Sequence, residues 1–330
     1  MLRAASIGMG WWSDELADAA QGKSDAIRIV TCFSRSEQKR AAFAEKYGTA
    51  QHESYEAVLA DDSIDAVILT TPHSIHSEQV IAAAAAGKHV FCEKPFTLTR
   101  ASAQAAVDAC AEAGVVLAVG QNRRWHSATR TLKAMLGAGD FGTVLHAEAN
   151  FSVPSALSYK TGQWRVSRIE SPAGSITGLG IHMIDALVYL LGPIARVAAQ
   201  AHRRAVPVDI DDTTSVLFLF ESGVSGYLGT MFACPHASYI NVYGTGGNAF
   251  AQIDNSQLIL QSADGVRHDE PIEPLDTLKL ELDEFAAACA GEAQFTVPPE
   301  DAVHGIAVME ALVEAAATGQ WVEVAGGGGL

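Results

Sequence analysis

The first 120 residues alternate short apolar runs with longer stretches of helical character, and this alternation constrains the fold more than any other feature. Strands are predicted at Ala4–Ile7 and Ile27–Phe33, each followed by a helix, at Trp11–Ala20 and Ser36–Tyr47. The alternation continues with strands at Ala66–Thr70, His89–Cys92 and Val115–Val119 and helices at His76–Ala86 and Arg100–Ala113. Strands joined by helices of this length form right-handed crossovers, so the segment predicts a doubly wound parallel sheet.

The pattern changes after about residue 122, where strands begin to follow one another directly. Helices are predicted at Ser127–Gly137 and Ile181–Leu191, on either side of a strand at Val144–Phe151. Further strands are predicted at Ile194–His202, Thr213–Phe220, Gly226–Phe232, Ser238–Gly244, Ala249–Ile253 and Gln257–Gln261, and helices at Leu275–Ala290 and Pro299–Thr318. A chain of 330 residues favours two domains. We therefore expect an α/β domain at 1–121 and an α+β domain at 122–330 with a large open, mainly antiparallel sheet.

The turn after the first strand reads Gly8-Met9-Gly10-Trp11-Trp12-Ser13 and opens a helix. Gly8 allows a tight turn, and Gly10 lets the backbone approach a pyrophosphate at the helix N-terminus. Ser13 stands where a third glycine is usual. In this strand–turn–helix context the pattern predicts a Rossmann dinucleotide site with Trp11 and Trp12 beside the cofactor, although a glycine turn without a ligand is the alternative.

The end of the second strand bears on the choice of cofactor. NAD sites usually place Asp or Glu there, whereas this chain has Ser34 and Arg35 and no acid before Glu37. A hydroxyl followed by a guanidinium suits a 2′-phosphate, so NADP is favoured over NAD. The alternative is that Ser34 and Ser36 are only turn and cap residues and that Arg35 is solvated.

Composition excludes several classes of function. The net charge of −16 argues against a nucleic-acid or anionic-membrane partner. Five cysteines without CxxC spacing are typical of a reduced, cytoplasmic chain, and the longest apolar run, Ile81–Ala86, is too short to span a bilayer. No metal is expected, since His73 and His76 lack a Cys or carboxylate at ligand spacing.

Several motifs together resemble the glucose–fructose oxidoreductase, inositol dehydrogenase and rhizopine-catabolism (Gfo/Idh/MocA) family over essentially the whole chain. These motifs are Glu93-Lys94-Pro95 after a strand, Thr71-Pro72-His73-Ser74-Ile75-His76, Gly120-Gln121-Asn122-Arg123-Arg124, Trp164-Arg165 and the glycine-rich segment from Gly174 to Asp185. The resemblance implies an NAD(P)-dependent oxidoreductase. It also implies that Thr71, Pro72, His73, His76, Glu93, Lys94, Pro95 and Asn122 lie at the cofactor.

Lys94 is the principal catalytic candidate. The resemblance implies that it transfers a proton at the substrate carbinol and that its bond to Pro95 is cis. Independently, Lys94 follows a strand at the carboxyl edge of the predicted sheet, where open α/β sheets bind ligands. Partial desolvation and a nearby nicotinamide cation would lower the pKa of such a lysine. The alternative is a solvated lysine in a turn.

The second catalytic candidate is His182, within Gly178-Leu179-Gly180-Ile181-His182-Met183-Ile184-Asp185. The resemblance implies that His182 bonds a substrate hydroxyl and that Asp185 supports it, although a buried histidine bonded to Asp185 is the alternative. The family usually has Asp four residues before this His, where this chain has Gly178. Thr177 could take over, the substrate class could differ, or the protein could lack dehydrogenase activity.

Arg124 and Arg165 are further substrate-binding candidates, with Trp164 placed to stack on a ring. Two arginines facing one pocket would suit a substrate carboxylate, and solvated arginines are the alternative.

The function expected from the resemblance is hydride transfer between nicotinamide and a secondary alcohol or ketone of a sugar, inositol or related cyclic polyol. A carboxylated cyclic dihydrodiol is one alternative substrate. A glycosidase that uses a tightly held NAD and a non-enzymatic NAD(P)-binding regulator also remain open. The open sheet is expected to form a homodimer or homotetramer.

Overall fold

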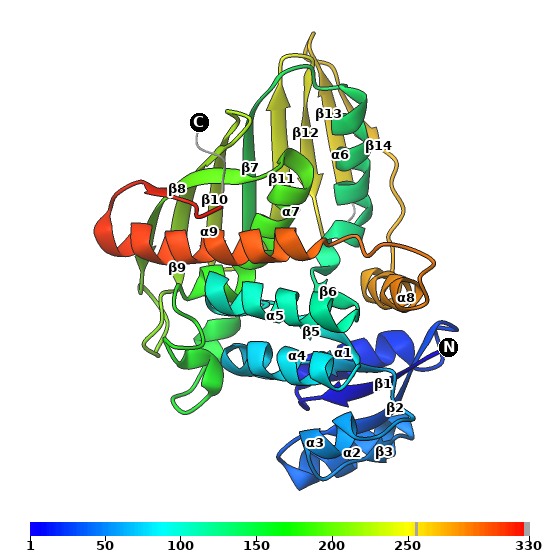
Figure 1. The fold of residues 1–330 in the computed structure, drawn as a ribbon. Helices are drawn as coiled ribbons and strands as arrows, with labels where there is room; N and C mark the ends of the chain where they lie inside the picture. Colours follow the sequence, from blue (N-terminus) through cyan, green and yellow to red (C-terminus); the bar gives the residue numbers. More distant parts are fainter. Residues whose placement is uncertain (255–256, 327–330) are drawn as a thin grey trace. The chain divides into compact units, whose positions relative to one another are not determined.

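The computed structural model describes residues 1–254 and 257–326, and their contacts form two compact units (Figure 1). The first unit combines Met1–Asn122 with Asp276–Val303. The second combines Arg123–Leu275 with the chain from His304 onward. The first boundary lies beside the predicted one, but 276–303 belongs to the first unit and not to a contiguous C-terminal domain.

The first unit contains a six-stranded parallel sheet in the order β3-β2-β1-β4-β5-β6. The strands are β1 (Leu2–Ile7), β2 (Ile27–Phe33), β3 (Ala50–Gln51), β4 (Ala66–Leu69), β5 (His89–Glu93) and β6 (Leu117–Gly120). This order is that of the Rossmann fold, which confirms the predicted fold class. The order reverses between β1 and β4, so a ligand crevice is expected beyond their carboxyl ends.

Helices connect these strands with the expected end signals. They are α1 (Trp11–Ala20), α2 (Glu37–Tyr47), α3 (Tyr55–Leu59), α4 (His76–Ala85) and α5 (Arg100–Ala113), with short turns η1 (His73–Ile75) and η2 (Asn122–Trp125). The Ser36 hydroxyl caps α2 by accepting from the Lys39 N–H, and Gly48 ends it at φ 65°. The short β3 and α3 were not predicted, because so few residues carry no periodic signal.

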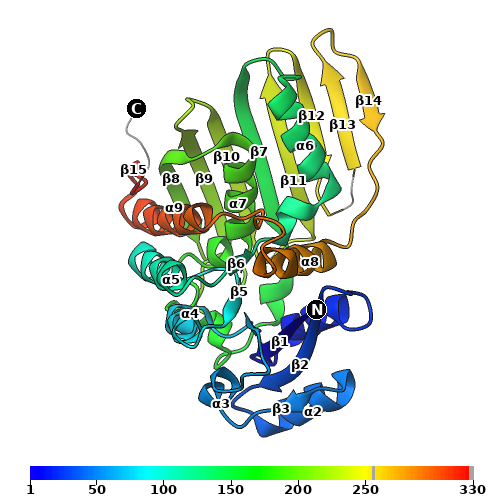
Figure 2. The ribbon, with the colours of Figure 1, turned by 45° about the vertical axis from the view of Figure 1, so that its right-hand side comes forward.

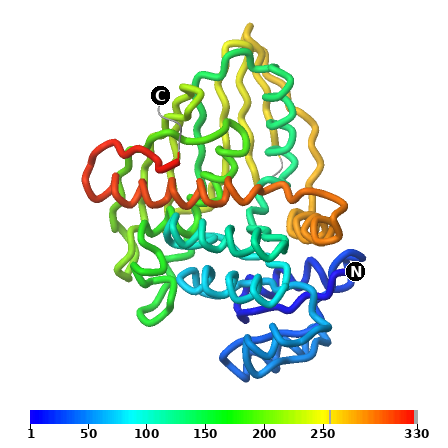
Figure 3. The backbone as a smooth tube through the Cα atoms, viewed as in Figure 1, coloured from blue at the N-terminus to red at the C-terminus, as the bar shows by residue number. Residues whose placement is uncertain are grey.

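Helix α8 (Thr277–Cys289) completes the core of the first unit from far along the chain. Leu282 and Phe285 are fully buried, and the Phe285 ring lies 5.7 Å from that of Phe91 in an edge contact. The Ser24 hydroxyl donates to Asp283 on the exposed side of α8. Figure 3 traces this return, with α8 beside α1.

The second unit contains a nine-stranded sheet in the order β14-β13-β12-β11-β7-β10-β9-β8-β15. The strands are β7 (Val144–Ser152), β8 (Ile194–His202), β9 (Thr213–Phe220), β10 (Ser225–Met231), β11 (Ala237–Gly244), β12 (Gly247–Gln252), β13 (Gln257–Ser262), β14 (Arg267–Glu270) and β15 (Val322–Glu323). Neighbours run antiparallel except β7 and β10, which run parallel. The mainly antiparallel open sheet is thereby confirmed.

One face of this sheet is covered by helices, as Figure 2 shows for α6 (Ser127–Ala138) and α7 (Ile181–Leu191). On β7 the alternate residues Ala147 and Ala149 are fully buried beneath them. The opposite face carries Leu217, 50% exposed, and its cross-strand neighbour Tyr227. The remaining elements are η3 (Ser155–Ser158), η4 (Trp164–Val166), the π-helical turn η5 (Ile176–Gly180) and α9 (Pro299–Thr318).

Candidate active site

The glycine turn is fixed by the close approach of β1 and β4. Gly8 has φ +92°, and a Cβ atom there would lie 3.0 Å from the carbonyl carbon and oxygen of Thr70. The Gly8 N–H donates to the Phe33 carbonyl at 2.8 Å, and the Thr70 hydroxyl donates to the Gly8 carbonyl at 2.6 Å. Only glycine meets both the positive φ and the lack of space.

Ser13 stands at the position of the usual third glycine, and its side chain hydrogen bonds the turn. Its buried hydroxyl donates to the Gly10 carbonyl at 2.6 Å and accepts from the Gly10 N–H at 3.0 Å. No heavy atom lies within 4 Å of a Cβ placed on Gly10, so the backbone is open to a ligand there. Trp11, 61% exposed, meets Trp12 edge to face at 4.9 Å. This open turn at the start of α1 fits a dinucleotide pyrophosphate.

The turn after β2 is supported by Arg40 of α2. Arg40 is 5% exposed and donates to the Ser34 carbonyl at 2.7 Å and to Glu53 at 3.0 Å. Arg35, which follows Ser34 in the sequence, is exposed. Arg40 therefore holds the turn that presents Ser34 and Arg35, a role its place among charged helix residues did not reveal.

Glu93 and Lys94 end β5, and the Lys94–Pro95 bond is cis, as the family resemblance implied. Glu93 is 6% exposed and accepts from the Lys94 N–H at 3.2 Å. Burial raises the pKa of Glu93 to about 7, against the opposing effects of the Lys94 charge and the Trp12 indole. A Cβ atom on Gly120 would lie 2.8 Å from the Glu93 carboxylate, so Gly120 makes room for this group.

His76 lies between the loop after β4 and the turn after β5, and its expected contact with the cofactor stays a prediction. It is fully buried, with Nδ1 3.0 Å from the Pro95 carbonyl oxygen and Nε2 2.9 Å from that of Thr71. Carbonyl oxygens only accept, so both contacts become hydrogen bonds when the ring is an imidazolium. His76 thus ties the loop after β4 to the turn after β5.

Other predicted cofactor residues lie on the same edge of the first sheet. The Thr71 hydroxyl donates to Gln79 at 2.5 Å, Pro72 precedes η1, and His73 begins it. The Asn122 amide donates to the Thr277 hydroxyl at 3.3 Å, at the start of α8. Their contact with a cofactor stays a prediction.

In the second unit, His182 lies in the first turn of α7, directly after the π-helical turn. It is 6% exposed, and its ring meets that of Phe151 edge to face at 5.8 Å. Thr177 is fully buried, and its hydroxyl accepts from the Ala173 N–H at 3.3 Å. This hydrogen bond ties Thr177 to the segment before the π-helical turn, and its taking over from an acid at Gly178 stays a prediction.

Arg124 and Asp185 form a buried ion pair, and their expected roles in substrate binding stay predictions. The guanidinium donates to Asp185 through Nε at 2.9 Å and Nη2 at 2.7 Å, and it lies over the Tyr189 ring at 4.9 Å. The side chains are 1% and 3% exposed. The Arg124 charge is matched inside the protein, so this pair anchors α7 to η2.

Arg165 differs from Arg124 in its surroundings. Its guanidinium stacks on Trp164 at 4.2 Å, and burial lowers its pKa. Within the described part of the chain, Arg165 has no ion pair with a carboxylate. A half-buried cation of this kind remains a candidate for an anionic or hydroxylated ligand.

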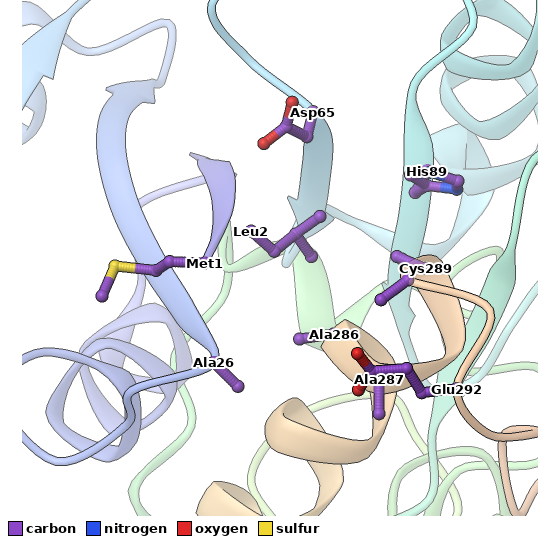
Figure 4. A pocket seen from close by; sticks show the side chains of 10 residues that line it. Met1, Leu2, Ala26, Asp65, His89, Ala286, Ala287, Cys289 and Glu292 are labelled. Carbon is purple, nitrogen blue, oxygen red and sulfur yellow. The ribbon is translucent and has the colours of Figure 1, made fainter.

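A separate cavity of about 410 Å³ opens at the amino edge of the first sheet (Figure 4). Leu2, Asp65 and His89 line it, at or next to the starts of β1, β4 and β5. It contains none of the predicted site residues. Among residues 1–254 and 257–326, no group of His, Cys, Asp and Glu could hold a metal, and no helix has the length and apolar character needed to cross a membrane.

Comparison with known proteins agrees with this arrangement. Residues 2–121 match the oxidoreductase family with an NAD-binding Rossmann fold, and 129–250 match the GFO/IDH/MocA C-terminal domain. The 1,5-anhydro-D-fructose reductase of Ensifer adhaerens is 31% identical, covering 90% of this chain and 91% of that protein. The D-xylose 1-dehydrogenase (NADP(+)) 2 of Haloferax volcanii is 31% identical over 88% and 90%.

A solved structure from Desulfitobacterium hafniense, assigned as an NADPH-dependent oxidoreductase, is 34% identical. It superposes with a TM-score of 0.92 over 98% of both chains. The glycine turn, the cis Lys94–Pro95 segment and both family matches lead to one conclusion: the chain belongs to the Gfo/Idh/MocA family of NAD(P)-dependent oxidoreductases.

Proposed function

We propose that the protein transfers hydride between the nicotinamide C4 of NADP and a secondary alcohol or ketone carbon of a sugar or related cyclic polyol. The observation that carries this proposal is Lys94, held in a cis turn at the carboxyl edge of the Rossmann sheet beside the buried Glu93. The sugar-processing relatives support the substrate class. The bound nicotinamide would supply the hydride acceptor or donor.

The chain's own groups supply positioning and proton transfer. In the oxidative direction the neutral amine of Lys94 takes the hydroxyl proton while the carbinol carbon loses hydride and becomes a carbonyl. The open backbone at Gly10 and the start of α1 suit the pyrophosphate. His182 bonds a substrate hydroxyl, and Trp164 with Arg165 contacts the substrate ring.

NADP preference is proposed from the turn after β2. Arg35 is exposed there, and the buried Arg40 guanidinium fixes the backbone of Ser34 by donating to its carbonyl. No acid is present to bond a free 2′-hydroxyl before Glu37. A forked guanidinium contact with a 2′-phosphate therefore fits this turn better than an NAD ribose does.

A carboxylated cyclic diol is a second candidate substrate. The half-buried Arg165, stacked on Trp164, favours this substrate. Asp185 already balances the charge of Arg124, whereas a substrate carboxylate would balance the charge of Arg165. Such a substrate would undergo the same hydride transfer at a ring carbinol.

The open face of the second sheet is proposed to pair with a second copy of the chain. Leu217, Tyr227, Tyr239 and Phe250 lie on this face, away from α6 and α7. Partly exposed apolar and aromatic side chains on one face of a sheet are typical of a subunit interface. A homodimer or homotetramer would bury them.

Replacing Lys94 with Ala should lower kcat by roughly a thousandfold, because the proton transfer loses its positioned base. The Kd for NADPH should change only a few fold. Turnover of a panel of sugars and cyclic polyols, followed by nicotinamide absorbance, measures this. Lys39→Ala, an exposed lysine on α2, is the control, and an undiminished kcat in Lys94→Ala would contradict the proposed role.

The raised pKa of Glu93 predicts how stability changes with pH. The folded protein keeps a proton that the unfolded chain releases above its ordinary pKa of 4.5. The resulting stabilisation is complete below that value and is lost as pH rises through about 7. Thermal unfolding should therefore show the Tm of the wild type falling relative to that of Glu93→Gln between about pH 5 and about pH 8. Parallel Tm profiles would show that Glu93 titrates normally.

Replacing Arg35 with Ala should weaken NADPH binding by roughly tenfold and NADH binding much less, because only NADPH carries the 2′-phosphate. Tryptophan fluorescence titration of both cofactors measures the difference. Lys39→Ala removes a nearby exposed charge and should leave the ratio of the two Kd values unchanged. Equal losses for both cofactors would argue against an NADP site.

Replacing Leu217 with Lys should shift the protein from oligomer to monomer, because it places a charge in the proposed interface. Light scattering coupled to size exclusion measures the mass. Leu145→Lys is the matched control: Leu145 is 56% exposed and lies on the same face of β7 as Ala147, opposite to the face that carries Leu217. A monomeric wild type would refute the pairing.

A further inference from the structure

Three aromatic side chains gather at the end of the second sheet around the turn that leads into His182. Phe151 meets the His182 ring at 5.8 Å with an interplanar angle of 68°. Phe232 packs against Gly178, and the Tyr159 ring lies 6.1 Å from the Phe232 ring. We refer to Phe151, Tyr159 and Phe232 as the aromatic wall.

The backbone fixes the wall in place. Strands β7 and β10 run parallel as neighbours, with Phe151 opposite Thr230, so Phe151 and Phe232 leave adjacent strands at the same end. The Phe232 N–H donates to the Asp212 carbonyl at 2.8 Å, and its own carbonyl accepts from the Ala156 N–H at 3.1 Å. Phe232 is 6% exposed. Its ring position is therefore set by the sheet and not by a free loop.

Gly178 and Phe232 are sterically complementary. Gly178 precedes His182 by four residues, about one helical turn, and a Cβ atom there would lie 2.7 Å from Phe232 Cζ. That distance is shorter than carbon atoms tolerate, so a side chain at 178 would displace the ring. Carbon surface thus occupies the place beside His182 where a polar side chain could otherwise project.

This surface discriminates between parts of a ligand. A hydroxyl group pressed against an aromatic ring loses its water without gaining a partner, whereas a C–H face gains dispersion contacts. We infer that the aromatic wall receives a hydroxyl-free face of the substrate ring next to the group bound by His182. The inference rests on the proposed function and narrows its substrate to deoxygenated sugars or simple cyclic diols, in preference to fully hydroxylated polyols.

The test compares two six-membered rings, trans-cyclohexane-1,2-diol and myo-inositol, on the full-length protein saturated with NADP. Calorimetry gives the Kd of each ring, and nicotinamide absorbance gives kcat/KM. The wild type should bind the diol at least about tenfold more tightly than inositol. Phe232→Leu, which keeps an apolar side chain but removes the ring, should reduce this ratio by about tenfold.

A second variant changes the Gly178 side of the contact between Gly178 and Phe232. Gly178→Ala should push the Phe232 ring away and lower the diol preference in the same direction. Phe141→Leu is the matched control, since Phe141 is a buried phenylalanine just before β7, at the other end of that strand from Phe151, and should leave the ratio unchanged. Circular dichroism confirms that each variant is folded.

The outcomes separate this inference from the proposed function. Equal Kd values for the two rings, no binding of either ring, or an unchanged ratio in both Phe232→Leu and Gly178→Ala would overturn the aromatic-wall inference. Turnover of polyols with no diol preference would leave hydride transfer standing while removing the inference. Selective diol binding without turnover of any substrate would leave the inference standing while removing hydride transfer.

Discussion

The close approach of β1 and β4 at the reversal of strand order is the constraint on which the first unit depends. The Gly8 backbone lies against the Thr70 carbonyl, and the Thr70 hydroxyl bonds back to Gly8. No side chain fits between the two strand ends, so the chain must turn there with positive φ. The start of α1 and the loop after β4 meet at this contact, and His76 ties the turn after β5 to that loop.

Buried polar groups then fix the loops that the sheet brings together. His76 joins the carbonyls of Thr71 and Pro95, and Arg40 holds the Ser34 carbonyl. The pair Arg124–Asp185 does the same work in the second unit. Each of these buried side chains lies close to a candidate ligand-binding residue and fixes the backbone that carries that residue. Rigid support of this kind suits a site that must align two reactants.

The sequence predicted most of the fold because strands and helices have distinct apolar periods and end signals. The ranges of β2, α1, α5 and α7 followed from local pattern alone. The membership of α8 did not, because an amphipathic helix shows which of its faces is buried but not which sheet covers it. Ser13 was recognisable as a small residue in the glycine turn, although its two hydrogen bonds were not.

The candidate site was predicted less completely, for a related reason. Motif positions identified Lys94 and His182, but partners distant in sequence decide whether a charged side chain is available. Arg124 and Arg165 look alike in the sequence, yet only Arg124 has a carboxylate beside it within its unit. Likewise, nothing in the segment around Gly178 points to Phe232, because the two meet only through the packing of η5 against the end of β10.

The return of α8 to the first unit makes that unit discontinuous along the chain. Leu282, Phe285 and Ala286 fill a core whose other buried members come from the first 120 residues. During synthesis the Rossmann sheet therefore has an unfilled apolar surface until the chain has extended past residue 290. A segment cut after Asn122 would keep that surface exposed, so exchanging the nucleotide-binding part between relatives requires both segments to be moved together.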